Sequence, residues 1–199
     1  DCIGLTSIEI PNSVTSIADE TFCNCKNLTS IEIPNSVTSI GNNAFLWCSS
    51  LTSISIPYSV TSIGSHALGG CSSLVSIVVE SGNNKYDSRI NCNAIIETAS
   101  NTLIAGCMNS IIPNSVIVIG DGAFGYCSYL TSIEIPNSVI SIDNNAFYDC
   151  SGLTSIISLN PTPPTCGIDV FYNVNVGNIT LEVPAESVSM YQSADTWKD

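Results

Sequence analysis

Apolar positions recur along the chain with a fixed period. The string LTSIEIPNSVTSI begins at Leu5 and at Leu28, and closely similar strings begin at Leu51 and Leu130. The first three copies are 23 residues apart. A cysteine column follows the same period at Cys2, Cys25, Cys48, Cys71, Cys127 and Cys150. Two independent columns with one period predict a repeat architecture in which each copy forms one layer.

Within a repeat, the spacing of apolar residues changes along its length and predicts successive segments. Leu28, Ile31 and Ile33 follow the L-x-x-L-x-L spacing of a leucine-rich-repeat strand, which leaves Glu32 pointing outward. The proline that follows ends the strand, because proline has no amide hydrogen for the ladder. A second short strand and a tight corner come next. Residues 44–51 then follow a helical period for about two turns.

The repeat is interrupted once, by an insertion at about residues 80–110. Pro57 and Pro113 are 56 residues apart, which is two periods plus about ten residues. Two aliphatic runs around a short polar turn predict a β-hairpin from Ala94 to Gly106. A polar loop precedes the hairpin, and loops inserted on one side of a solenoid often form its binding edge. The candidate contact residues in this loop are Lys85, Tyr86 and Arg89.

These elements predict an α/β repeat solenoid, rich in β-structure, with parallel strands and short helical turns. One repeat buries too little apolar surface to fold alone, so stacked neighbours must stabilise each other. We expect the solenoid to span residues 1–158. A proline-rich break then precedes a C-terminal cap over residues 159–199, with a strand at 179–183 and a short helix at 185–191. The chain begins within a repeat, as expected for a segment of a longer protein.

The repeat resembles the BspA-type leucine-rich-repeat family, named for bacterial surface protein A. The pattern LTSIxIPxSVTSIGxxAFxxCxxL covers roughly residues 1–158, and its Ala-Phe pair recurs at Ala44, Ala123 and Ala146. The hairpin insertion and the tail VPAESVSMYQSADTWKD also look like segments of gut-anaerobe members. The resemblance implies a secreted or surface-displayed bacterial protein that adheres to host proteins or other microbes, without an active site. The sequence departs from the pattern at Thr21, Leu68 and Ser110.

Composition narrows the classes of partner. Seventeen acidic and four basic residues give a formal net charge of −13, so nucleic acids and anionic lipids are repelled. No apolar run approaches the roughly 20 residues that span a bilayer, and we expect no membrane insertion within this chain. Only 11% of residues are charged, and the abundance of Ser, Thr and Asn favours an extracellular or cell-surface location. No phosphate-binding glycine loop or EF-hand pattern is present.

Ten cysteines raise the alternatives of disulfides, a metal site and buried thiols. Stacked layers would place the column cysteines about 4.8 Å apart with parallel side chains, which favours buried free thiols. Cys23 and Cys25 lack the C-x-x-C spacing of zinc sites. Cys92 and Cys107 would face each other if the hairpin loop has four residues, so a disulfide between them stays open. His66, the only histidine, is expected to be an exposed turn residue.

The outward glutamates Glu9, Glu32 and Glu134 are candidate contact residues, because they occupy one column of the predicted open sheet. Neighbouring carboxylates about 4.8 Å apart would match the spacing of a retaining glycosidase pair. However, the open face provides no pocket to raise either pKa, and repeat copying explains the spacing. A single histidine also removes most imidazole-based schemes. We therefore predict that the chain is not an enzyme and uses no cofactor or metal.

The leading hypothesis is an adhesin-like, extracellular protein-binding module that uses the open sheet face and the inserted loop. Replacing the three loop residues together should then weaken binding without lowering stability. A carbohydrate-binding module is the alternative, but it needs aromatic platforms, and the outward strand positions contain none. The aromatic candidates Trp47, Tyr58 and Tyr126 are assigned to corners or helical turns. A third alternative is a passive spacer that displays another domain.

Overall fold

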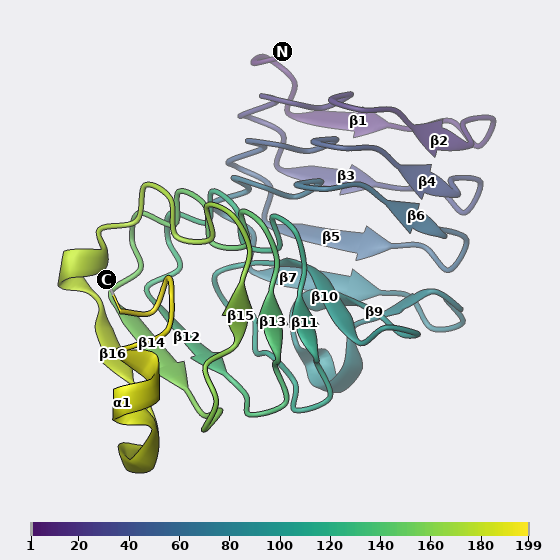
Figure 1. Ribbon diagram of the computed structural model, residues 1–199. Coiled ribbons are helices and arrows are strands. Elements are labelled where there is room, and N and C mark those ends of the chain that lie inside the picture. Colours follow the sequence, from purple (N-terminus) through teal and green to yellow (C-terminus); the bar gives the residue numbers. More distant parts are fainter. Residues whose placement is uncertain (1, 199) are drawn as a thin grey trace.

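The computed structural model describes residues 2–198 as a β-solenoid of about eight turns, roughly 23 residues apart (Figure 1). A regular turn begins with a strand of three or four residues and continues through a corner into a two-residue strand. Successive tight turns then complete the layer. The solenoid fold predicted from the repeat is confirmed.

The first strands of the turns form one column, which we call the strand side. Ile8 lies opposite Ile31, one full repeat later, and Ile133 lies opposite Ile156. Each position along a strand therefore has an equivalent residue in the next layer, and the apolar side chains face the core. The pairing is parallel, and β7 and β12 belong to different sheets. The members are β1 (Ser7–Glu9), β3 (Ser30–Glu32), β5 (Ser53–Ile56), β7 (Ser76–Val79), β12 (Ser132–Ile135), β14 (Ser155–Ser158) and β16 (Thr180–Glu182).

The second strands form another column beyond the proline corner, with parallel pairing inside two sheets that the insertion separates between β6 and β11. In it, Ile17 lies opposite Ile40, and Ile119 lies opposite Ile142. Its members are β2 (Ser16–Ile17), β4 (Ser39–Ile40), β6 (Ser62–Ile63), β11 (Val118–Ile119), β13 (Ser141–Ile142) and β15 (Thr165–Cys166). The pairs β13–β15 and β14–β16 extend the pattern to Glu182. The boundary near residue 158 stays a prediction.

The third side, which we call the turn side, is the segment predicted to have a helical period. Its backbone closes i→i−3 hydrogen bonds, for example from Leu46 N–H to Asn43 O at 3.1 Å. Asn43 and Trp47 adopt left-handed conformations, with φ of 55° and 59°, so the chain turns instead of continuing as a helix. Neighbouring layers are also joined here, since Phe22 N–H donates to Ala44 O at 2.8 Å.

The insertion forms β8 (Tyr86–Asp87), a 3₁₀ turn η1 (Arg89–Asn91) and the hairpin of β9 (Ala94–Glu97) and β10 (Thr102–Gly106). This hairpin separates two apolar cores. Ile95 packs in the N-terminal core, whereas Ile96 and Leu103 pack in the C-terminal core. All three are fully buried. The continuous AII run is explained by this position, because a strand covered on both faces has no solvent side.

The hairpin register decides the relation between its two flanking cysteines. Glu97 pairs with Thr102, so the loop has the four residues that the disulfide hypothesis required. The register then shifts by one residue between Leu103 and Ala105. This bulge takes Cys107 out of line with Cys92, and both are free thiols in the structure. The disulfide left open by the sequence is not formed here.

The repeating cysteines are free, and all of them except the exposed Cys2 are buried. Cys48 Sγ donates to Phe22 O at 3.1 Å, and Cys150 Sγ donates to Phe124 O at 3.0 Å. Desolvation by burial raises the pKa of Cys48 to about 12 and that of Cys150 to about 12. The prediction of buried free thiols is confirmed for these positions, and neutral thiols of this kind are poor nucleophiles.

The C-terminal end packs against the last layers of the solenoid. After η2 (Val176–Asn178), the predicted helix is present as η3 (Ala185–Ser187) followed by α1 (Val188–Tyr191). Tyr191 is buried, and its hydroxyl donates to Asn160 O at 2.9 Å. Trp197 Nε1 donates to Pro164 O at 2.8 Å. These bonds tie the tail to the segment that follows β14.

Candidate interaction surfaces

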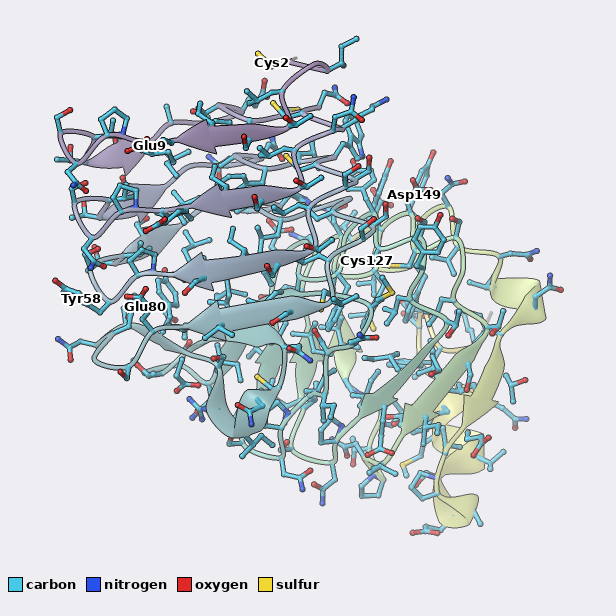
Figure 2. All side chains as sticks on the ribbon, turned by 180° about the vertical axis from the view of Figure 1, so that it is seen from behind. Cys2, Glu9, Tyr58, Glu80, Cys127 and Asp149 are labelled. Atoms are coloured by element: carbon cyan, nitrogen blue, oxygen red, sulfur yellow. The ribbon has the colours of Figure 1, made fainter. Side chains whose placement is uncertain are left out.

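The strand face, defined as the outward side chains of the strand-side column, carries an acidic stripe in its N-terminal half. Glu9 lies opposite Glu32, and Ser55 lies opposite Val78. Both glutamates are exposed, and Figure 2 shows Glu9 at the end of the first strand. The column therefore changes from two carboxylates to a small hydroxyl and then to an apolar side chain as it approaches the insertion.

A second outward column undergoes the same change. Thr6, Thr29 and Thr52 precede the first three strands, and Val75 takes the equivalent place in the fourth turn, where its N–H donates to Thr52 O at 3.0 Å. Val75 is 42% exposed and Val78 is 48% exposed. Both are exposed apolar side chains in the turn that borders the insertion, and we call these two positions the valine patch. An apolar centre beside polar and acidic side chains is a pattern typical of protein interfaces.

The C-terminal half of the strand face has its own acidic column. Glu134 lies opposite Ile157, which lies opposite Glu182. Glu134 does not continue the stripe of Glu9 and Glu32, because the insertion interrupts the sheet between β7 and β12. The expectation of one column with all three predicted glutamates fails at this point.

Arg89 of the inserted loop is held by its neighbours. Its guanidinium donates to both carboxylate oxygens of Asp87, at 2.8 and 2.7 Å. It also donates to Asn101 Oδ1 at 2.8 Å and to Ser115 Oγ at 3.0 Å. The hydrogen bond to Asp87 raises the pKa of Arg89 above its ordinary value. This arginine therefore fastens the loop to the hairpin tip and to the next turn.

The other two predicted loop residues also make internal contacts. Lys85 Nζ lies 2.6 Å from Glu97 Oε1. Tyr86 is only 5% exposed, and its hydroxyl accepts a hydrogen bond from Ile63 N–H at 3.1 Å. This burial contradicts the expectation that the three loop residues can be replaced without loss of stability, since removing a buried aromatic ring leaves a cavity.

His66 is half-buried, in contrast to the exposed position expected from the sequence. Its ring occupies space that a side chain at Gly122 or Gly125 would fill, because a Cβ at either glycine would meet its Nδ1 within 2.8 Å. Among residues 2–198, Nδ1 is buried without a hydrogen-bond partner. Desolvation lowers the pKa of His66 below its ordinary value, although the nearby Asp121 opposes this shift.

The turn side carries a row of aromatic side chains that the sequence analysis did not assemble. Trp47 contacts Tyr126 with ring centroids 5.5 Å apart, and Tyr126 contacts Tyr148 at 5.3 Å. Tyr148 stacks on Tyr172 at 4.9 Å. Trp47 and Tyr126 occupy equivalent places in their repeats, on opposite sides of the insertion. Counting back from each following cysteine, Cys48 and Cys127, shows that the two positions are equivalent, but not that their rings touch.

Within the part of the chain that the structure describes, no three His, Cys, Asp or Glu side chains are placed to hold a metal ion. No helix among the described residues has the length and apolarity needed to cross a membrane.

Comparison with known structures supports the fold. A leucine-rich cell surface protein from Faecalibacterium prausnitzii is 24% identical and superposes with a TM-score of 0.52, over 96% of this chain and 63% of its own. The pneumococcal vaccine antigen PcpA is 19% identical, with a TM-score of 0.57 over 91% of this chain and 62% of its own. The chain therefore spans less than two thirds of the length of these relatives.

Comparison of the sequence with protein-family models identifies the family of this chain, whereas comparison with curated sequences does not. No curated protein sequence matches this chain significantly. The model of the BspA type leucine-rich repeat region matches residues 1–102 and 105–194, in six copies. This match covers most of the chain and includes both sides of the insertion. The chain belongs to the BspA-type leucine-rich-repeat family.

Proposed function

We propose that this chain is an extracellular or cell-surface module that binds a protein partner, in an adhesin-like role, through its strand face. Leucine-rich-repeat proteins are generally binding or scaffold modules, and the Faecalibacterium relative is described as a cell surface protein. The observation that carries the proposal is the valine patch beside the acidic stripe of Glu9 and Glu32.

The chemistry of this face defines the partner. Strands leave the face nearly flat, and its outward residues repeat from layer to layer, so it suits a broad protein surface better than a small molecule. The partner should place an apolar side chain over Val75 and Val78 and basic side chains opposite Glu9 and Glu32. Such charge complementarity mainly accelerates association. Host matrix proteins and microbial surface proteins are the classes that we expect to supply this partner.

The C-terminal half provides a second acidic segment. Glu134 and Glu182 are exposed on either side of Ile157, and we include Glu134 among the contact residues. Lys85, Tyr86 and Arg89 act as supports for the loop that borders the valine patch, because their side chains are engaged in internal bonds.

The test measures binding of the purified chain to immobilised matrix proteins and to bacterial surface proteins by biolayer interferometry. We expect saturable binding to at least one basic partner, weakened by salt. The double variant Val75→Ser, Val78→Ser should lower affinity about tenfold or more, as for residues at an interface centre. Charge reversal by Glu9→Lys and Glu32→Lys should mainly slow association.

The control replaces exposed Tyr129, which is 64% exposed and lies outside the strand-face columns, by alanine. This variant should bind like the parent chain. Absence of saturable binding to every protein tested, or full binding by the valine double variant, would contradict the proposal.

A further inference from the structure

The turn side contains a groove that the proposed protein contact does not use. It holds about 480 Å³. Two parallel columns of side chains line it, and the two columns are two residues apart in each turn. Trp47 and Ser49 contribute from one turn, and Tyr126 and Ser128 occupy the equivalent positions in another. The groove therefore follows the solenoid axis. Its polar lining residues are Asn24, Lys26, Ser49, Ser72, Ser128 and Asp149.

Gly70 accounts for the shape of the groove floor. It occupies the place equivalent to Trp47 in the next turn and has a φ of +66°. A Cβ at Gly70 would lie only 2.2 Å from Cδ1 of Trp47. Because no side chain fills this position, the indole lies across the glycine and reaches Tyr126.

The aromatic rings of the groove are partly open to solvent. Trp47 and Tyr126 meet edge to face, with an interplanar angle of 74°, and in such a pair the ring that presents its edge keeps both faces free of its partner. Trp47 is 40% exposed. The groove thus combines flat apolar rings with a polar rim.

The rim supplies hydrogen-bond donors and acceptors together. Among residues 2–198, Lys26 is the basic side chain that makes no ion pair, and it lines the groove with three available donors. Asn24 adds an amide, and Asp149 adds carboxylate oxygens. Ser72 donates to Ser49 O at 3.4 Å, which leaves its own oxygen lone pairs to accept. A hydroxyl both donates and accepts, so it can pair with every group of this rim.

The backbone at the groove floor is closed to an added strand. Trp47 N–H donates to Gly69 O at 2.8 Å, and Gly70 N–H donates to Gly125 O at 3.3 Å. A peptide that binds by strand addition needs free backbone groups, and these donors are already used. The net charge of −13 opposes polyanions. An occupant should therefore be uncharged, rich in hydroxyls and flat enough to pack on rings.

We infer that the turn-side groove binds a neutral oligosaccharide chain, lying along the solenoid axis. Its sugar rings place their C–H faces on Trp47 and Tyr126, and its hydroxyls bond with Asn24, Lys26 and Asp149. This site is independent of the strand face, so the chain can hold a glycan and a protein partner at the same time.

The experiment titrates the purified chain with linear gluco-, manno-, xylo- and galacto-oligosaccharides and follows calorimetry and tryptophan emission. The chain has two tryptophans, and Trp197 is buried at the C-terminal end, so an emission change on binding reports Trp47. We expect saturable binding of at least one neutral oligosaccharide. Trp47→Ala and Tyr126→Ala should each lower its affinity at least about tenfold.

Matched variants separate the site from general effects. Tyr129→Ala removes an exposed tyrosine outside the groove and should leave affinity unchanged, whereas Trp47→Phe keeps an aromatic plane and should retain part of it. The pair Glu9→Lys, Glu32→Lys should not affect oligosaccharide binding. The inference would be overturned if no neutral oligosaccharide bound, or if acidic oligosaccharides were preferred. Full affinity in the folded variant Trp47→Ala, or in the folded double variant Trp47→Phe, Tyr126→Ala, would overturn it as well.

Discussion

The strand side and the turn side of this solenoid respond differently to the same insertion. On the strand side, β7 and β12 fall in different sheets, and Figure 1 shows the two sets of strands running in different directions. On the turn side, Gly70 N–H donates directly to Gly125 O. The hairpin joins the second-strand column, where β10 pairs with β11. The extra residues are therefore absorbed on the two sides that carry strands, while the turn side keeps its layer-to-layer hydrogen bonds.

This difference also separates two kinds of surface. Opening the strand side leaves a flat acidic face that ends in the valine patch, beside the hairpin. Keeping the turn side continuous brings Trp47 and Tyr126 together from opposite sides of the insertion. A solenoid can thus tolerate an enlarged turn if one side stays in register, and that side gains long-range contacts that the repeat alone would not produce.

The hairpin that joins the second-strand column at the insertion should be the most sensitive part of the molecule. Ile95→Ala removes a buried side chain from the N-terminal core, and Ile96→Ala removes one from the C-terminal core. Each should lower the free energy of unfolding by about 2–5 kcal/mol, because both sites are closely packed. Urea unfolding measures this, with the exposed hairpin tip Ala99→Ser as the control. A loss below about 1 kcal/mol for both isoleucines would show that the hairpin does not join the cores.

The turn side should be the more sensitive to alkaline pH, because it contains the buried thiols. Folding raises the pKa of these thiols. Their contribution to the free energy of unfolding is therefore complete below the unfolded thiol pKa near 9, and it is lost as pH rises toward 12. Cys48 and Cys150 have pKa values of about 12 in the folded state. At pH 10, each should lower the free energy of unfolding by about 1.4 kcal/mol. Urea unfolding at pH 8 and pH 10 tests this. The double variant Cys48→Ala, Cys150→Ala should show a smaller loss, and an equal loss would assign the effect to other groups.

The continuity of the turn side can be disturbed at one glycine. Gly70→Ala forces a left-handed alanine and a clash with Trp47, and we expect a loss of about 2 kcal/mol. Gly82→Ala is the matched control, because its φ is +91° but a Cβ there would have only Tyr58 Cβ nearby, at 4.0 Å. It should cost about 1 kcal/mol. Equal losses in thermal denaturation would mean that the indole moves aside without penalty.

Much of this arrangement could be predicted, because repetition makes local patterns reliable. The strand positions, the buried cysteine column and the hairpin follow from spacing within or between adjacent repeats and from the two aliphatic runs. The bulge after Leu103 does not, since nothing in the aliphatic run specifies where the register shifts. This shift separates Cys92 from Cys107.

The contacts made across the insertion were out of reach for another physical reason. His66 packs on Gly122, and Trp47 packs on Tyr126, at separations that are not multiples of the repeat. These pairs become neighbours only if the inserted residues lie outside the turn side. The sequence does not indicate which side of the solenoid holds the insertion. The candidate groove depends on that choice, whereas the acidic stripe within adjacent repeats does not.

The smallest expected effect concerns the acidic stripe. Glu9 and Glu32 lie opposite each other in register, and like charges placed in this way repel. Glu9→Gln with Glu32→Gln should therefore raise the free energy of unfolding by a few tenths of a kcal/mol at low salt. Added salt should stabilise the parent chain by a similar amount and the variant less, because screening removes the same repulsion. Thermal denaturation at two salt concentrations measures both, with Thr29→Ser as a neutral control on the same face. A destabilised variant would mean that the carboxylates support the fold, and the stripe would then owe its presence to structure, not to a partner.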